Sequence, residues 1–188
     1  MTKALSIKNT MIFTTAKTRT IAAVFAIALA VALPQAFHVA GAIMGVGTAM
    51  GEIFLPMHLA IFAVGLLAGG YTGAVAGLLA PMISFFLTGM PAQAMLPYMM
   101  AELMAYGLIA GLLADKNLPV IAKLLIAQIG GRLVKITAIA IGVFAFSSQL
   151  NPANVIFAVK TGLPGLIIQW IAIPVLMYAI ARISTKDE

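Results

Sequence analysis

Apolar residues run along this chain in six long segments, separated by short stretches rich in glycine, proline or polar residues. A helix needs about 20 mostly apolar residues to cross a bilayer, and the segments lie near that length. We therefore expect an all-α integral membrane protein with six transmembrane helices in a single membrane domain over residues 1–188. A basic lead over residues 1–19 precedes the helices, and a short tail over 184–188 follows them. The predicted helices occupy residues 20–39, 52–68, 71–87, 92–114, 118–146 and 152–183.

The stretch 51–93 carries the clearest packing signal. Its two apolar halves meet at a Gly-Gly-Tyr-Thr-Gly turn, are rich in glycine and alanine, and contain Pro56 and Pro81. In a soluble helix glycine costs about 1 kcal/mol and proline about 3 kcal/mol, whereas in a membrane neighbouring helices satisfy the freed backbone groups. Small residues also let helix backbones approach closely. We expect a membrane hairpin around which the other helices pack.

Composition agrees with a membrane protein. The chain is 63% hydrophobic and only 9% charged, against roughly 45–50% apolar residues in soluble domains. Cysteine is absent, which excludes a disulfide framework and a cysteine-ligated metal. Basic residues before the first apolar segment resemble the start of a signal peptide. That segment is long, and no small-residue cleavage site is followed by a soluble domain, so we interpret it as the first transmembrane helix.

Lysine and arginine predict the orientation. With six helices both termini lie on one side of the membrane, and the loops on the other side, around residues 40–51, 88–92 and 147–152, contain no basic residue. Cytoplasmic loops are enriched in lysine and arginine, so both termini are expected in the cytoplasm. The basic residues assigned to that side are Lys3, Lys8, Lys17, Arg19, Lys116, Lys123, Arg182 and Lys186.

Ionisable residues inside a bilayer are costly, and each becomes a functional candidate. Five lie within the predicted spans: His58, Glu102, Arg132, Lys135 and Lys160. At 1.5 Å per residue they fall in the outer half to the middle of the membrane, from about 9 Å deep for the histidine to about 15 Å for the glutamate. This distribution over four helices predicts a polar pocket that opens outward.

Structural roles compete with this interpretation. Glu102 and Arg132 are suited to pair with each other and join two helices, and Tyr106, one turn from Glu102, is placed to hydrogen-bond it. His58 is also suited to helix packing, and the lysines to extending toward the membrane surface. The cations nevertheless outnumber the carboxylates, and excess buried positive charge is expensive without an anion. A ligand carboxylate, phosphate or electron-rich ring would supply a partner.

Methionines gather in the outer half of the predicted helices, where they either fill packing gaps or line a pocket for a partly apolar ligand. From this group and its neighbours we add Met57, Met90 and Tyr98 to the predicted ligand-binding residues. The outer loops are uncharged and rich in turn formers, so they serve either as connections or as lids. Asn151 in the last outer loop is a further ligand-binding candidate.

Motifs for catalysis are missing from the sequence. It has no HExxH, no GxSxG and no phosphate-binding loop, so neither an enzyme nor ATP hydrolysis by that route is expected. Two histidines and no cysteine make a metal site unexpected, and no cofactor is predicted for this chain. The first helix carries Ala22, Ala26 and Ala30 at spacing four. This flat face suits close approach by a partner helix or packing inside the chain.

These features together resemble the substrate-binding S components of energy-coupling factor (ECF) transporters, the bacterial vitamin importers. The resemblance covers about residues 20–183 and is carried by the alanine face, Glu102-Leu103-x-x-Tyr106-Gly107 and Gly131-Arg132-Leu133-Val134. Longer matching strings are FLPMHLAIFAVGLLAG at 54–69, GGYTGAVAGLLAPMISFFLTGMP at 69–91 and TGLPGLIIQ at 161–169.

The resemblance implies a six-helix protein of the bacterial cytoplasmic membrane with both termini inside and a ligand site near the outer surface. It also implies partners: a vitamin or cofactor precursor, a coupling membrane protein docked on the alanine face, and two cytosolic ATPase subunits that use ATP. Three alternatives stay open: a stand-alone secondary transporter or channel, an intramembrane enzyme, and a purely structural membrane subunit. No nucleic-acid partner is expected, because the basic residues are not clustered on a polar surface.

Overall fold

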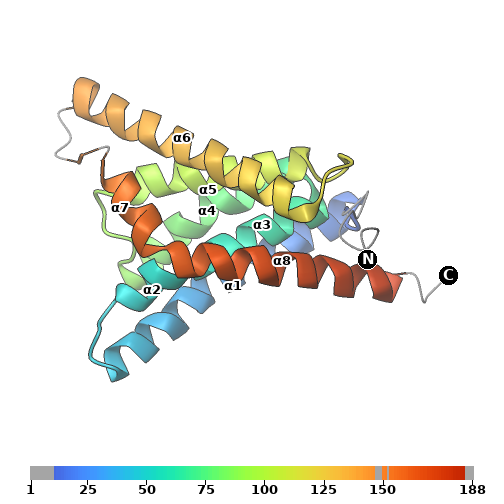
Figure 1. Ribbon diagram of the computed structural model, residues 1–188, viewed down its shortest axis with the longest axis horizontal. Helices are drawn as coiled ribbons and strands as arrows, with labels where there is room; N and C mark the ends of the chain where they lie inside the picture. Colours follow the sequence, from blue (N-terminus) through green and yellow to red (C-terminus); the bar gives the residue numbers. More distant parts are fainter. Residues whose placement is uncertain (1–10, 147–149, 152, 185–188) are drawn as a thin grey trace.

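The computed structural model describes residues 11–146, 150–151 and 153–184, and within these residues every regular element is a helix. The predicted all-α class is confirmed. Figure 1 shows the helices packed side by side along one long direction. They are α1 (Ala16–Ile43), α2 (Ala49–Phe54), α3 (Pro56–Ala68), α4 (Gly70–Thr88), α5 (Leu96–Leu112), α6 (Val120–Phe146), α7 (Asn154–Thr161) and α8 (Leu163–Ser184).

Five helical stretches are long and apolar enough to cross a membrane. They are α1, the combined stretch Ala49–Ala68, α4, α6 and α8. The remaining predicted span, 92–114, is shorter in the structure, because α5 begins only at Leu96 and has 17 residues. Such a helix is about 25 Å long. A multi-pass membrane protein is therefore supported by five of the six predicted segments, and six crossings stay a prediction.

Two of the predicted helices are broken, which corrects their expected boundaries. The segment 52–68 divides at Leu55, whose left-handed conformation (φ 48°, ψ 47°) separates α2 from α3. Pro56 explains the position of this break, because proline has no N–H to donate and disfavours α-helix at the residue before it. The segment 152–183 divides at Gly162 into α7 and α8, with Pro164 at the start of α8.

The two breaks lie against each other. A Cβ on Gly162 would meet the Leu55 side chain at 2.7 Å, and one on Gly165 would lie 2.5 Å from the carbonyl oxygen of Phe54. The glycines therefore let the start of α8 approach the backbone between α2 and α3. This contact joins segments that are more than 100 positions apart in the sequence.

Glycines also permit the closest helix contacts in the predicted hairpin. Added Cβ atoms on Gly73 and Gly107 would overlap the backbone of the facing glycine, and one on Gly65 would lie 2.6 Å from the Gly107 carbonyl oxygen. Helices α3, α4 and α5 therefore meet backbone to backbone, as small residues allow in membranes. The expectation of a tightly packed hairpin is confirmed.

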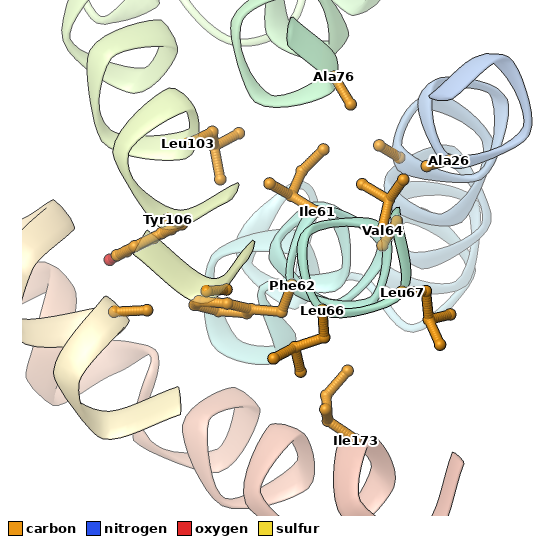
Figure 2. Close-up of a cluster of buried hydrophobic side chains, with 14 of the residues drawn as sticks. Ala26, Ile61, Phe62, Val64, Leu66, Leu67, Ala76, Leu103, Tyr106 and Ile173 are labelled. Carbon is orange, nitrogen blue, oxygen red and sulfur yellow. The ribbon is translucent and has the colours of Figure 1, made fainter. Parts of the chain in front are cut away.

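Helix α3 lies at the centre of the apolar core. Figure 2 shows its side chains surrounded by residues from α1, α4, α5 and α8, including Ala26, Ala76 and Ile173. Phe62 and Tyr106 are both buried, and their ring centroids lie 4.9 Å apart. Helix α3 is therefore fixed in place by neighbours on several sides.

Four of the described basic residues gather at one end of the molecule, whereas Arg132 and Lys135 lie in its interior and Lys160 lies on α7 towards the other end. The start of α1, the α5–α6 connection and the end of α8 lie at this end (Figure 1), and with them Lys17, Arg19, Lys116 and Arg182. Lys123 lies one turn into α6, and its Nζ donates to the Ala114 carbonyl oxygen at 2.6 Å. The predicted basic residues Lys3, Lys8 and Lys186 lie outside the described residues. The side of the membrane that this end faces stays a prediction.

Candidate functional site

A cavity of about 450 Å³ is lined by residues of helices α1 to α7 and extends from the interior to exposed loops. Its deep wall contains fully buried Glu102, and its outer rim contains exposed Thr48, Glu52 and Ala92. The rim belongs to the end of the molecule opposite the one that carries Lys17, Arg19, Lys116 and Arg182, whereas Lys160 lies on α7 on the rim's side. The lining residues are Pro34, His38, Thr48, Gly51, Glu52, Leu55, Pro56, Met57, His58, Ser84, Met90, Pro91, Ala92, Met95, Met99, Glu102, Arg132, Lys135, Phe157, Ala158 and Thr161.

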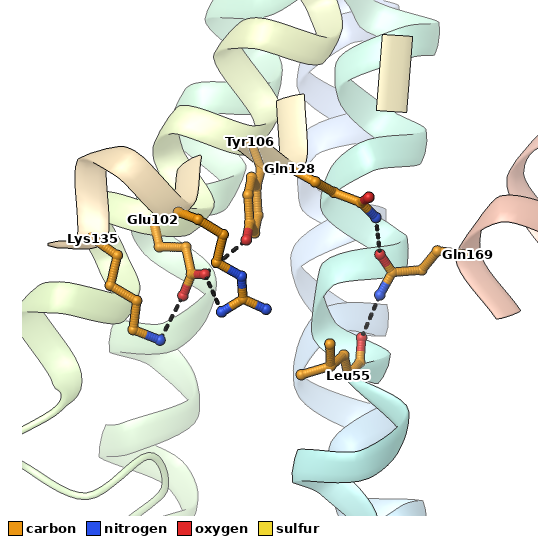
Figure 3. A network of polar contacts seen from close by, with 7 residues as sticks. Leu55, Glu102, Tyr106, Gln128, Lys135 and Gln169 are labelled. Atoms are coloured by element: carbon orange, nitrogen blue, oxygen red, sulfur yellow. Dashed lines mark hydrogen bonds and ion pairs between the residues drawn. The ribbon is translucent and has the colours of Figure 1, made fainter. Parts of the chain in front are cut away.

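Glu102 on α5 is the centre of the polar wall. Its Oε1 accepts a hydrogen bond from the Tyr106 hydroxyl at 2.7 Å and lies 2.7 Å from Nη1 of Arg132. Its Oε2 accepts from Nζ of Lys135 at 2.8 Å, as Figure 3 shows. Three donors from two helices therefore hold one buried carboxylate, which fixes the position of the cluster.

Helical periodicity brings the two cations to the same carboxylate. Arg132 and Lys135 are three residues apart on α6, so they share one face of that helix. The expected Glu102–Arg132 pair and Tyr106–Glu102 hydrogen bond are both present. All three charged residues also line the cavity. The same side chains therefore join α5 to α6 and form the polar wall of the candidate ligand site.

The charges of this cluster do not cancel. Two cationic side chains face one carboxylate, and the Arg132 and Lys135 side chains are only 12% and 9% exposed. Nη2 of Arg132 is buried and has no hydrogen-bond partner, and the same holds for both ring nitrogens of His58. Buried polar groups are normally hydrogen-bonded. The guanidinium of Arg132 and the imidazole of His58 therefore have hydrogen-bonding capacity left for a group in the cavity.

His58 lies on α3, lines the same cavity as the ion cluster and is 4% exposed. Its ring centroid lies 5.5 Å from that of Tyr106. His38 on α1 also lines the cavity, and its Nδ1 is buried without a partner. Histidines from two helices thus add to the polar lining. His38 has the same sequence signal as His58, a lone histidine in an apolar segment, but it lies near the predicted outer helix end.

Methionines form much of the apolar lining. The predicted residues Met57 and Met90 both face the cavity, together with Met95 and Met99. Tyr98 does not line it. That side chain lies against α6, where a Cβ on Gly142 would collide with its hydroxyl. A flexible thioether wall adapts to varied apolar shapes.

Two other predicted residues lie away from the cavity. Lys160 is exposed on α7, before the break at Gly162, which corrects its expected place in a continuous sixth helix. Other residues of α7, among them Ala158 and Thr161, do line the cavity. Asn151 is exposed, and its Oδ1 accepts from the Ala153 backbone N–H at 2.8 Å. Neither residue lines the cavity.

A chain of amide side chains lies beside the helix breaks. Gln128 on α6 donates through Nε2 to Oε1 of Gln169 on α8 at 3.0 Å, and Gln169 donates to the Leu55 carbonyl oxygen at 3.4 Å (Figure 3). Trp170 donates to Oε1 of Gln128 at 2.9 Å. These contacts support the α2–α3 break next to the cavity. Sequence reasoning missed them, although two glutamines in apolar helices were a visible signal.

The alanine stripe is partly internal. Ala30 is fully buried and Ala26 is 5% exposed, and both belong to the apolar core. For Ala30, one of the three predicted docking residues, the structure favours the alternative of packing inside the chain, since α1 packs that residue inward. Ala22 and Ala26 line an apolar groove of about 380 Å³ between α1, α3 and α8. Docking on this groove stays a prediction.

Within the described residues no three histidine or acidic side chains gather as a possible metal site. What the cavity offers chemically is a set of hydrogen-bond donors and net positive charge at its deep end, with thioethers on its walls. Comparisons with protein-family models, with curated proteins and with solved structures find no match.

Proposed function

We propose that this chain is the substrate-binding S component of an ECF-type importer. It captures a vitamin or cofactor precursor at the outer face of the bacterial cytoplasmic membrane for ATP-driven uptake by partner subunits. The observation that carries the proposal is the cavity whose deep wall holds two cations around one carboxylate, with the donors of His58 and Arg132 left free. A ligand of small-molecule size fits its volume of about 450 Å³.

The position of the cavity supports import rather than a structural role. Its rim lies opposite the end that carries Lys17, Arg19, Lys116 and Arg182. By the positive-inside rule that basic end faces the cytoplasm, so the cavity opens outward. Six crossings and cytoplasmic termini are part of the same proposal.

The groove at Ala22 and Ala26 supports a membrane partner. It is almost entirely apolar, and its small residues allow close helix approach. In the proposed complex a coupling membrane protein docks here and two cytosolic ATPase subunits supply the energy. This chain then needs no catalytic residue and no cofactor of its own.

The binding role is tested on the chain purified alone in mild detergent. Native mass spectrometry is followed by denaturing extraction of any bound molecule. We expect one small molecule per chain. Reconstitution in liposomes tests the transport class: uptake only in the presence of the coupling protein, the ATPases and ATP supports the S component. Uptake by this chain alone would instead assign a secondary transporter or channel. If the chain neither carries a bound solute nor assembles with partner subunits, the proposal is overturned.

A further inference from the structure

The deep wall of the cavity carries a net positive charge that an anionic ligand can balance. Arg132 and Lys135 contribute two positive charges and Glu102 one negative charge, which leaves one positive charge. The other acidic residue of the lining, Glu52, is exposed at the rim and therefore hydrated. An uncompensated buried charge is strongly unfavourable. One negative charge at the deep wall would balance the cluster.

The free donors indicate where that charge would bind. Nη2 of Arg132 is buried and unpartnered because Glu102 takes only Nη1 of the same guanidinium. The ring of His58 lies on the opposite helix, 4% exposed, with neither nitrogen hydrogen-bonded. A planar acceptor with two oxygens suits a guanidinium donor and an imidazole N–H at once.

We propose that the ligand carries a singly charged carboxylate and enters the cavity with that group first. The carboxylate accepts from Nη2 of Arg132 and from His58, and the apolar remainder lies against Met57, Met95 and Met99. This proposal rests on the binding role stated above and adds the chemical class and orientation of the ligand. A doubly charged phosphate would instead leave one excess negative charge buried at the same place.

Three probes with the same phenyl ring separate the possible charges: benzoate, benzamide and phenyl phosphate. Each is titrated at pH 8 and constant ionic strength against the thermal unfolding midpoint of the detergent-solubilised chain, after removal of any co-purified solute. A ligand that binds only the folded state raises the midpoint according to its affinity. We expect benzoate to bind at least 10-fold more tightly than benzamide and phenyl phosphate.

Variants connect the preference to the named groups. Arg132→Lys keeps the charge but removes the free nitrogen, so benzoate affinity falls at least 10-fold. Glu102→Gln raises the net charge of the cluster by one, and the preference moves at least 10-fold toward phenyl phosphate. Lys160→Gln removes an exposed cation that does not line the cavity, and serves as the matched control with less than a twofold change.

Several results would overturn the proposal. Equal stabilisation by benzoate and benzamide would show that charge is not recognised, and tighter binding of phenyl phosphate would assign a phosphoryl ligand. Absence of stabilisation by all three probes also contradicts it. If Arg132→Lys fails to fold, an unchanged preference in Glu102→Gln is sufficient to reject the charge argument. A neutral solute extracted from a chain that still assembles with its partners would reject only this inference and leave the import function standing.

Discussion

Gly73 on α4 and Gly107 on α5 face each other so closely that a Cβ on either residue would overlap the backbone of the other. Neither residue therefore tolerates a side chain without movement of a helix. The same α5 carries Glu102 less than two turns away, so this contact sets the depth at which the carboxylate meets Arg132 and Lys135. A packing contact between two residues without side chains thus positions the polar wall of the cavity.

Gly107→Ala is expected to destabilise the chain by at least about 2 kcal/mol, because the added methyl group collides with backbone rather than with a movable side chain. Thermal or SDS-induced unfolding in detergent measures the loss. Gly70→Ala is the matched control, since its Cβ would lie 3.0 Å from the Leu108 carbonyl oxygen and needs only a small adjustment. Equal stability of the two variants would contradict the close contact.

Glu102→Ala is expected to cost about 3–5 kcal/mol of folding free energy, because it leaves two buried cations without their carboxylate. Lys135→Met should cost clearly less, since Glu102 keeps Arg132 and the Tyr106 hydroxyl as partners. Unfolding curves of both variants in the same detergent check the ranking. If Lys135→Met proves the more damaging change, Glu102 is not the centre of the cluster.

Gln169→Leu is expected to destabilise the chain by about 1 kcal/mol, the usual scale of an interhelical hydrogen bond in a membrane protein. The change removes the donor to the Leu55 carbonyl and the acceptor for Gln128. Hydrogen exchange at the α2–α3 break should accelerate relative to α4. Gln35→Leu is the control, because that residue is bonded only to the exposed Thr88 hydroxyl at 3.3 Å.

Ala22→Leu is expected to weaken assembly with the proposed coupling protein at least several-fold while solute binding is retained, because the side chain would fill the apolar groove. Ala30→Leu should instead lower the stability of the isolated chain, since that alanine is fully buried. Co-purification and unfolding measurements separate the two effects. Normal assembly of Ala22→Leu would show that the groove is not the docking surface.

Sequence alone determined the helical class and the polar residues of the cavity wall. Long apolar segments leave no alternative to helices that satisfy their own backbone in a membrane. Within such segments His58, Glu102, Arg132 and Lys135 stood out because burying them is costly, and the structure places all four in one cavity. The spacing of Glu102 and Tyr106 likewise predicted their hydrogen bond.

Only the tertiary structure decided which candidates share the site. Lys160 falls outside the cavity although Phe157, Ala158 and Thr161 of the same helix line it, and exposed Asn151 does not line it either. Tyr98 falls outside because its side chain lies against α6. Ala22 and Ala30 each lie four positions from Ala26 in the sequence, yet Ala30 packs inward and Ala22 lines a groove. The sequence shows which polar side chains are costly to bury in an apolar segment. The rotation of each helix and the position of its breaks determine which of these side chains meet.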